Sequence, residues 1–144
     1  MNTFLVQELT RFNNLLRVIQ STLKSILLAL KGEVLLSEQL EKVYNSLLIG
    51  EIPQMWLAQS YPSLKNVASY IKDLVLRLNT YTQWVSSGPP NVFWISGFFF
   101  TQSFLTGVFQ NYARKYKVEI DTLVYDFEYR HEEDPTDYEQ EIFT

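Results

Sequence analysis

The sequence predicts a mainly α-helical protein, a bundle of about five helices with one β-strand near its C-terminal end. Three observations support this fold class. Apolar residues recur at helical spacing over most of residues 1–116, and glycines and prolines separate these stretches. Only after residue 117 do apolar and charged residues alternate, as in a strand. The 144 residues are 47% hydrophobic, which favours one folded domain with a core over a disordered polypeptide.

The first predicted helix covers residues 2–31 and has the most regular pattern. Its apolar residues follow each other at alternating steps of four and three, at Leu5, Leu9, Phe12, Leu16, Ile19, Leu23, Ile26 and Leu30. Gly32 is expected to end the helix. Leu15, Leu27 and Leu28 widen the apolar face, which favours packing inside a bundle. A coiled coil with another molecule is the alternative interpretation.

Two shorter helices are predicted next. Ser37 is a candidate N-cap for a helix over residues 38–48, and Gly50 is expected to stop it. Ile52-Pro53 begins a third, short helix, because proline is tolerated in the first turn.

A fourth and a fifth helix complete the predicted bundle. Tyr61-Pro62 interrupts the helical pattern, Ser63 opens a helix that reaches about residue 86, and Gly88-Pro89-Pro90 must end it. The fifth helix is expected over residues 98–116.

The alternation of Tyr125, Phe127 and Tyr129 with Asp126 and Glu128 predicts a half-buried strand at 124–129. A single strand cannot form a sheet. We therefore expect its partner strands in another segment of a longer protein or in another molecule. The sequence accordingly divides into a helical part, 1–117, and a remaining part, 118–144.

Charge is concentrated at the C-terminal end. The net charge is −4, yet residues 126–144 hold eight acids and one base. This pattern favours a solvated acidic loop or tail, and a docking surface for a basic partner is the alternative. No part of the sequence is basic enough to predict nucleic-acid binding.

Few residues are available for chemistry. There is no cysteine, and no two glycines lie closer than nine residues, so neither a P-loop nor a dinucleotide-binding loop is present. The one histidine, His131, is the only candidate base for a serine-type triad, but its acidic surroundings favour a solvated loop residue. The acids Glu132, Glu133, Asp134 and Asp137 lack the spacing of an EF-hand. We therefore predict no catalytic, cofactor-binding or metal-binding residue.

The uncharged stretch from Val92 to Phe109 raises the question of a membrane span. Gln102 near its centre and the glycines Gly97 and Gly107 favour instead a buried helix in a folded domain. An exposed aromatic surface for a partner is the other alternative. The N-terminus lacks the basic residues of a signal peptide.

One family resemblance extends over roughly residues 1–129. Its strongest part is Gly88-Pro89-Pro90, then Val92-Phe93-Trp94-Ile95-Ser96-Gly97-Phe98-Phe99-Phe100-Thr101-Gln102-Ser103-Phe104-Leu105-Thr106-Gly107 and Gln110-Asn111-Tyr112-Ala113-Arg114-Lys115-Tyr116. Arg11-Phe12-Asn13, Asn45-Ser46-Leu47-Leu48-Ile49-Gly50 and Ser60-Tyr61-Pro62-Ser63-Leu64-Lys65 also match. Together they resemble the C-terminal domain of axonemal dynein heavy chains. Two of the runs, 98–102 and 110–115, are more similar to the inner-arm, single-headed type.

The resemblance implies a structural and regulatory segment without a catalytic site. In this family a ring of AAA+ modules hydrolyses ATP with Mg and moves toward the microtubule minus end. The C-terminal domain lies against the ring, with a helical part followed by an incomplete β-barrel, which the strand at 124–129 would begin.

Partners and location follow from the same resemblance. The implied partner is the AAA+ ring of the same heavy chain. Microtubules and dynein light and intermediate chains are contacted only through the parent protein, and neither nucleic acid nor membrane is expected. The implied location is the cytoplasm, within the cytoskeleton and the cilium axoneme. The alternative function is a free-standing helical protein-interaction module.

Overall fold

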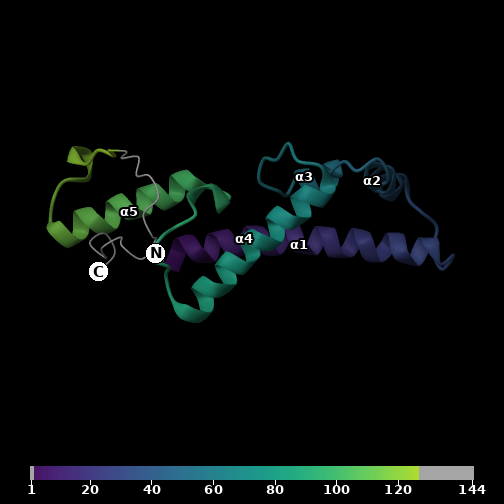
Figure 1. The fold of residues 1–144 in the computed structure, drawn as a ribbon, viewed down its shortest axis with the longest axis horizontal. Helices are drawn as coiled ribbons and strands as arrows, with labels where there is room; N and C mark the ends of the chain where they lie inside the picture. Colours follow the sequence, from purple (N-terminus) through teal and green to yellow (C-terminus); the bar gives the residue numbers. More distant parts are fainter. Residues whose placement is uncertain (1, 127–144) are drawn as a thin grey trace.

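The computed structural model describes residues 2–126, which form five α-helices and two short 3-10 helices (Figure 1). The α-helices are α1 (Asn2–Leu30), α2 (Glu38–Leu48), α3 (Gln54–Leu57), α4 (Val67–Ser87) and α5 (Thr101–Tyr116). The 3-10 helices are η1 (Ile95–Gly97) and η2 (Ile120–Thr122). The mainly α-helical prediction with five helices is therefore confirmed.

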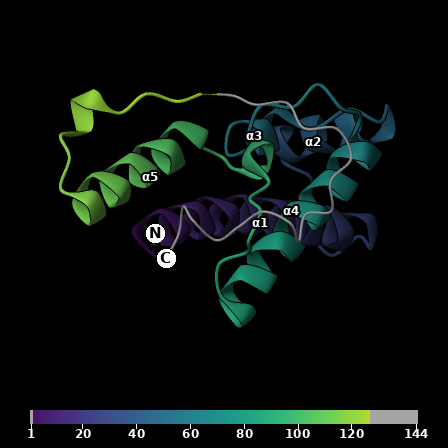
Figure 2. The same cartoon turned by 60° about the vertical axis from the view of Figure 1, so that its left-hand side comes forward.

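Helix α1 is the axis on which the other elements are arranged. It contacts α2, α3 and α5. In Figure 1, α2 and α3 lie over its C-terminal half, α4 crosses it, and α5 lies beside its N-terminal end. Figure 2 shows the same arrangement from the side, with α5 set apart from the crossing of α1 and α4.

The buried face of α1 differs from the predicted one. Leu23 and Leu30 were expected in the core, yet 37% and 63% of their surfaces are exposed. The buried stripe instead runs through Phe4, Glu8, Phe12, Leu15, Ile19, Thr22 and Ile26. Two of these residues are polar, and both find hydrogen-bond partners inside the protein. The buried face differs from the predicted one because apolar periodicity places polar residues on the surface, whereas polar groups with hydrogen-bond partners can be buried.

The boundaries of α2 and the end of α1 are as predicted. Gly32 follows α1 with φ 79, a left-handed conformation that favours glycine. Ser37 caps α2, because its hydroxyl accepts a hydrogen bond from the Leu40 amide at 3.4 Å. Pro53 stands one residue earlier than expected, at the N-cap of α3.

Helix α4 begins later than predicted. Asn66, not Ser63, is its N-cap and accepts a hydrogen bond from the Ser69 amide at 2.9 Å. Ser63 accepts from Lys65 in the turn before the helix. The core face of α4 consists of Tyr70, Leu74, Tyr81 and Trp84, whereas the apolar residues Ile71, Val75 and Val85 are exposed.

Helix α5 begins at Thr101, three residues later than predicted, because Phe98–Phe100 form an extended entry segment before it. Phe98 and Phe104 are buried against Phe4, with ring centroids 5.0 and 5.3 Å from its ring. We call the rings that meet here the aromatic cluster; it consists of Phe4, Trp84, Phe93, Phe98 and Phe104. The uncharged stretch is thus partly a buried segment and partly a helix. No helix among the described residues combines the length and apolarity that a membrane span needs.

The predicted strand is wrong over its first residues, since residues 124–126 have no strand conformation. The 3-10 helix η2 ends just before them, at Thr122, with the amides of Thr122 and Leu123 bonded to the carbonyl oxygens of Glu119 and Ile120. Tyr125 folds back onto α5, where its ring stacks on Phe109 at 4.0 Å. A strand needs a neighbouring strand, and residues 2–126 supply none. The rest of the predicted strand, 127–129, and the acidic segment to 144 lie outside the described residues.

Candidate functional site

The residues considered for chemistry in the sequence lie outside the described part of the protein. These are His131, Glu132, Glu133, Asp134 and Asp137. Within residues 2–126, no group of three or more potential metal ligands comes together.

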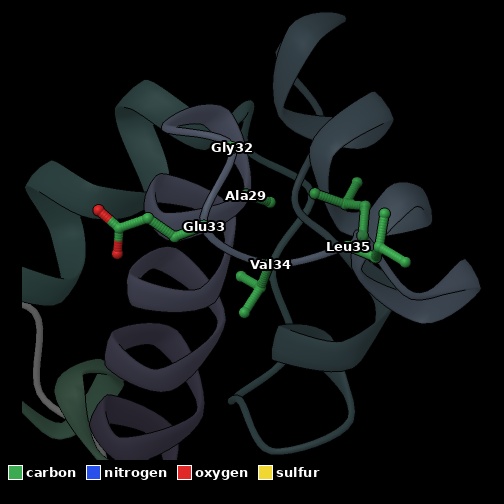
Figure 3. Close-up of a pocket in the computed structure, with 6 residues that line it drawn as sticks. Ala29, Gly32, Glu33, Val34 and Leu35 are labelled. Carbon is green, nitrogen blue, oxygen red and sulfur yellow. The ribbon is translucent and has the colours of Figure 1, made fainter.

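One hollow of about 380 Å³ lies at the junction between α1 and α2. It is lined by Ala29, Gly32, Glu33, Val34, Leu35 and Leu36 (Figure 3). The Glu33 side chain points away from Leu35 in this view, and Leu35 itself is 97% exposed. A ligand site usually combines an enclosed apolar pocket with converging polar groups, and this open hollow has no such convergence.

Besides Thr22, whose hydroxyl is paired with Trp56, two carboxylates form polar centres among the described residues. The first centre is Glu8 on α1, whose side chain is 1% exposed. Its Oε2 accepts hydrogen bonds from the Tyr81 hydroxyl at 2.8 Å and the Phe99 amide at 2.6 Å. Its Oε1 accepts from the Phe100 amide at 3.2 Å. One carboxylate thus joins α1, α4 and the entry of α5.

Arg11 and Tyr81 lie beside the Glu8 carboxylate. The Arg11 guanidinium lies 3.7 Å from Oε1 and is partly exposed to solvent. Burial of Tyr81, followed by the neighbouring Glu8 carboxylate, raises the pKa of the Tyr81 hydroxyl well above its usual value. Tyr81 therefore remains a hydrogen-bond donor at neutral pH, as the carboxylate requires.

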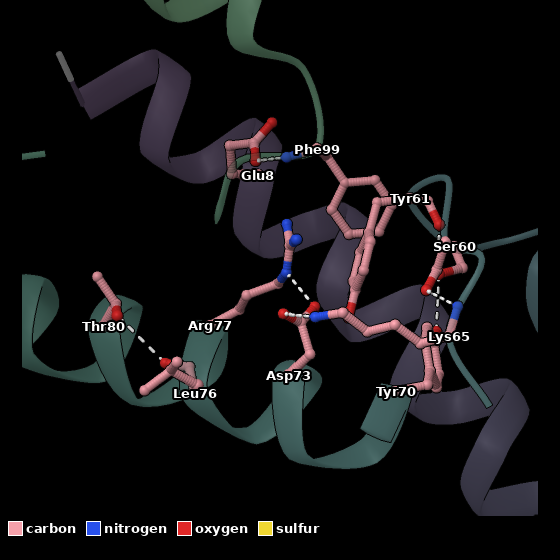
Figure 4. Close-up of polar contacts among 11 residues, drawn as sticks. Glu8, Ser60, Tyr61, Lys65, Tyr70, Asp73, Leu76, Arg77, Thr80 and Phe99 are labelled. Carbon is pink, nitrogen blue, oxygen red and sulfur yellow. Dashed lines mark hydrogen bonds and ion pairs between the residues drawn. The ribbon is translucent and has the colours of Figure 1, made fainter. Parts of the chain in front are cut away.

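The second centre is Asp73 on α4 (Figure 4). Its Oδ1 accepts from Lys65 Nζ at 2.7 Å and its Oδ2 accepts from Arg77 Nε at 2.8 Å. Burial alone raises the pKa of the Asp73 carboxyl, but the hydrogen bonds from Lys65 and Arg77 outweigh burial and hold the pKa below its usual value. Asp73 thus stays ionised and ties the loop before α4 to the helix.

Arg77 extends this centre to the η1 segment. Its guanidinium carbon lies 3.8 Å from the centroid of the Tyr61 ring and 5.3 Å from that of Trp94. Both distances allow cation–π attraction. Trp94 in turn covers Gly97, where an added Cβ would lie 2.8 Å from the indole ring atoms Cδ2 and Cε3. The packing of Trp94 therefore requires glycine at position 97.

The tyrosines beside Asp73 are buried as well. The Tyr70 hydroxyl and the Ser60 hydroxyl share a hydrogen bond of 2.7 Å. Burial, followed by the nearby Asp73 carboxylate, raises the pKa of Tyr61, so its hydroxyl also stays protonated at neutral pH. Neither tyrosine is therefore available as a base or nucleophile.

In both centres the carboxylate oxygens are engaged by other groups of the protein, whereas the buried Tyr61 hydroxyl has no hydrogen-bond partner among the described residues. A carboxylate that accepts from backbone amides and a tyrosine positions its neighbours. The sequence interpretation did not find Glu8, Asp73 or Arg77. The available signal for Glu8 was its spacing, because it stands four residues after Phe4 and four before Phe12, in the middle of an aromatic stripe.

Comparisons with known proteins show similarity to one family. The family profile for the C-terminal domain of the dynein heavy chain matches residues 1–142. Similar curated proteins include dynein axonemal heavy chain 3 of Homo sapiens, 56% identical over 128 residues, and dynein axonemal heavy chain 12 of Mus musculus, 58% identical over 128 residues. Dynein axonemal heavy chain 1 of Rattus norvegicus is 53% identical over 127 residues.

These relatives are much longer than the present protein. The alignments cover 89%, 89% and 88% of its residues but only 3%, 4% and 3% of the three relatives. The similarity therefore concerns one small segment of each relative.

Proposed function

The protein belongs to the family of C-terminal domains of dynein heavy chains, of the axonemal kind, and on this premise we propose that it is a non-catalytic structural and regulatory segment of an ATP-driven motor. The parent motor moves toward the minus end of microtubules in cilia and flagella. ATP and Mg are bound by the parent protein, outside this segment. The observation that carries the proposal is the family match over residues 1–142.

The two polar centres support a structural role. Glu8 and Asp73 each bind groups from separate elements of the fold, and these bonds determine how the elements are placed. Ionised groups at an active site are expected to face a cleft that a substrate can enter. Glu8 faces the interior of the domain instead.

The partner proposed here is the AAA+ ring of the same heavy chain. Apolar side chains remain exposed at the C-terminal end of α1 and on α2 and the loops that follow, at Leu27, Leu30, Leu35, Leu48, Ile49 and Leu64. Where such side chains join into one continuous apolar surface, that surface marks an interaction site. Because the sequence spans only 3–4% of its relatives, the remainder of the heavy chain is the most available partner for it. Microtubules and light or intermediate chains would be contacted only through that remainder.

The cellular location and the arm type of the parent heavy chain are proposed from its similarity to other proteins. We place the parent in the cytoplasm, in the cytoskeleton of the cilium axoneme, because the similar proteins are named axonemal heavy chains. We assign it to the inner-arm, single-headed type because the runs at 98–102 and 110–115 are more similar to that type.

We also propose a division into a helical part, 1–117, and a remaining part, 118–144, whose first residues pack back on α5 through Tyr125. Lys117 supports this division, because its backbone is left-handed with φ 54 and ends α5.

The experiment compares motor domains of an axonemal heavy chain that carry this segment in wild-type form or with Phe12→Asp. Phe12 is 1% exposed and its ring lies 5.0 Å from Tyr81, so the aspartate introduces an unpaired charge into the core. Thr10→Val, at an exposed site on the same helix, is the control.

We expect Phe12→Asp to leave ATP binding in place and to change ATPase rate and microtubule gliding velocity. Gliding velocity and ATPase rate equal to those of the Thr10→Val motor, with the segment shown to be unfolded, would contradict the proposal. In that case a free-standing interaction module becomes the better account.

A further inference from the structure

Helix α5 and the residues after it form a unit that is attached to the rest of the protein at one end. Figure 2 shows α5 alongside the N-terminal end of α1 and away from α2 and α3. The exposed C-terminal half of α5 includes Asn111, Tyr112 and Arg114–Lys117. Tyr125 packs against Phe109 within this unit. We call residues 98–126, the helix with its entry residues and the residues that follow it, the α5 unit.

Apolar and polar contacts fasten the α5 unit to the rest of the fold. The apolar contacts are Phe98 and Phe104 on Phe4, the Phe99 ring on Phe12 at 4.6 Å, and Leu105 and Val108 against the core. The polar contact is Glu8, which accepts hydrogen bonds from the amides of Phe99 and Phe100. Apolar packing allows a range of orientations of α5 on α1, whereas two hydrogen bonds to one carboxylate restrict α5 to one orientation.

Glu8 also supplies a negative charge at the start of α5, where the helix has no side-chain cap of its own. The N-cap position of α5 is Phe100, which has no side-chain oxygen and makes no capping hydrogen bond. The first amides of a helix lack partners within the helix, and a negative charge close to them is stabilising. The carboxylate that lies beside this helix start comes from α1, ninety-one residues away from Phe99 in sequence.

The contact is expected to open in an all-or-none manner. Glu8 is the only charged residue with a fully buried side chain in the part of the protein that the structure describes. An ionised carboxylate in the interior is tolerated only with its hydrogen bonds made. If α5 moves away, the amides of Phe99 and Phe100 lose their acceptor, and Glu8 keeps only the Tyr81 hydroxyl and the nearby Arg11. The two amides and the freed carboxylate oxygen must then be hydrated together, so intermediate positions are disfavoured.

We infer that Glu8 is a latch that holds the α5 unit in one orientation on α1, and that releasing it frees the α5 unit while α1 and α4 stay packed. The packing of α1 against α4 does not depend on the two amide bonds, because Phe12 contacts Tyr81 directly at 5.0 Å. A displacement of the N-terminal end of α1 therefore changes the orientation of α5 and of the residues that follow it.

The test uses distances between spin labels, which the absence of native cysteine makes straightforward. One pair, Asn13→Cys with Gln110→Cys, reports on α1 and α5, and a second pair, Asn13→Cys with Gln83→Cys, reports on α1 and α4. All three positions are exposed. Both pairs are measured in the 144-residue protein with Glu8 and with Glu8→Gln, which keeps the size of the side chain and removes its charge. Hydrogen exchange at the amides of Phe99 and Phe100 is followed in the same proteins.

We expect Glu8→Gln to broaden the α1–α5 distance distribution and leave the α1–α4 distribution narrow. Exchange at the two amides should accelerate roughly 10-fold to 100-fold, the range typical of losing hydrogen bonds to a charged acceptor. Tyr81→Phe is the matched control, because it removes one bond to Glu8 and leaves both amide bonds. It should preserve the α1–α5 distance.

Three outcomes would overturn the latch. The first is an unchanged α1–α5 distribution in Glu8→Gln. The second is equal broadening of both pairs, which would make Glu8 an ordinary core residue of the whole fold. The third is a Glu8→Asp variant in which α5 stays in place or the α1–α4 pair unfolds. Aspartate keeps the charge but shortens the side chain, so the inference predicts that Glu8→Asp also releases α5.

Discussion

The indole N–H of Trp56 donates a hydrogen bond of 2.9 Å to the hydroxyl oxygen of Thr22, and both side chains are buried. The Thr22 hydroxyl in turn donates within α1, to the carbonyl oxygens of Val18 and Ile19. A large aromatic residue on α3 is thereby held at one position along α1. The bond explains why a polar residue occupies the buried stripe of the longest helix.

Replacing Thr22 with Val should destabilise the protein by about 1–3 kcal/mol, because a similar shape remains while the Trp56 N–H loses its acceptor in the interior. Urea unfolding followed by tryptophan fluorescence measures the change. The matched control is Thr10→Val, since Thr10 makes the same kind of bond to Val6 at 2.8 Å on the exposed face of α1. We expect the control to change stability by less than about 0.5 kcal/mol. Equal effects of the two variants would show that the bond to Trp56 contributes nothing.

Substitution by alanine should change the stability of the protein in opposite directions at Gly97 and at Gly107. Gly97→Ala places a Cβ 2.8 Å from the Trp94 ring, so we expect a loss of about 1–3 kcal/mol from overpacking. Gly107 lies inside α5 with nothing within 4 Å of an added Cβ. Gly107→Ala should therefore stabilise α5 by roughly 0.5–1 kcal/mol. Thermal unfolding checks both.

The cause of the Gly97 effect can be tested separately. In a protein that already carries Trp94→Leu, Gly97→Ala should cost less stability than it does in the wild type, because the smaller side chain makes room for the new methyl group. Additive losses would mean that Trp94 is not the residue that excludes alanine.

Asp73 predicts a pH dependence of stability. Its pKa in the folded protein is lowered by Lys65 and Arg77, so the ionised form is favoured by folding. The stabilisation is complete above the ordinary carboxyl pKa of about 3.9 and is lost as the pH falls through the lower, folded value. Asp73→Asn should destabilise the protein by about 1–3 kcal/mol at pH 7.

The difference between wild type and Asp73→Asn should stay constant from about pH 7 to pH 5 and shrink below about pH 4. Chemical unfolding at a series of pH values measures it. Asp121→Asn, an exposed change on η2, is the control and should leave the wild-type profile unchanged. A difference that grows toward acid pH would reverse the sign expected from the lowered pKa.

The sequence was sufficient to predict the elements with strong local signals. Gly32, Ser37 and Gly88 act on the backbone next to them, so they predict the helix boundaries they produce. The start of α4 was misplaced because two residues that can cap a helix, Ser63 and Asn66, stand close together.

The interior was predicted less well, for a physical reason. Apolar periodicity assigns polar residues to the solvent, yet Glu8 and Thr22 are buried because donors and partners arrive from distant parts of the sequence. The stack of Arg77 between Tyr61 and Trp94 likewise joins a loop, a helix and the η1 segment. The alternating pattern that predicted a strand at 124–126 was misleading, since Tyr125 packs on Phe109 of α5 instead of pairing with a neighbouring strand.

The central claim, that this segment is structural and has no nucleotide site of its own, is tested most directly by thermal unfolding of the purified protein with and without Mg·ATP. A ligand that binds only the folded state raises stability by about 2.7 kcal/mol at a concentration one hundred times its Kd. We predict the same Tm at every nucleotide concentration. A Tm that rises with Mg·ATP concentration would contradict the account and place a nucleotide site within this segment.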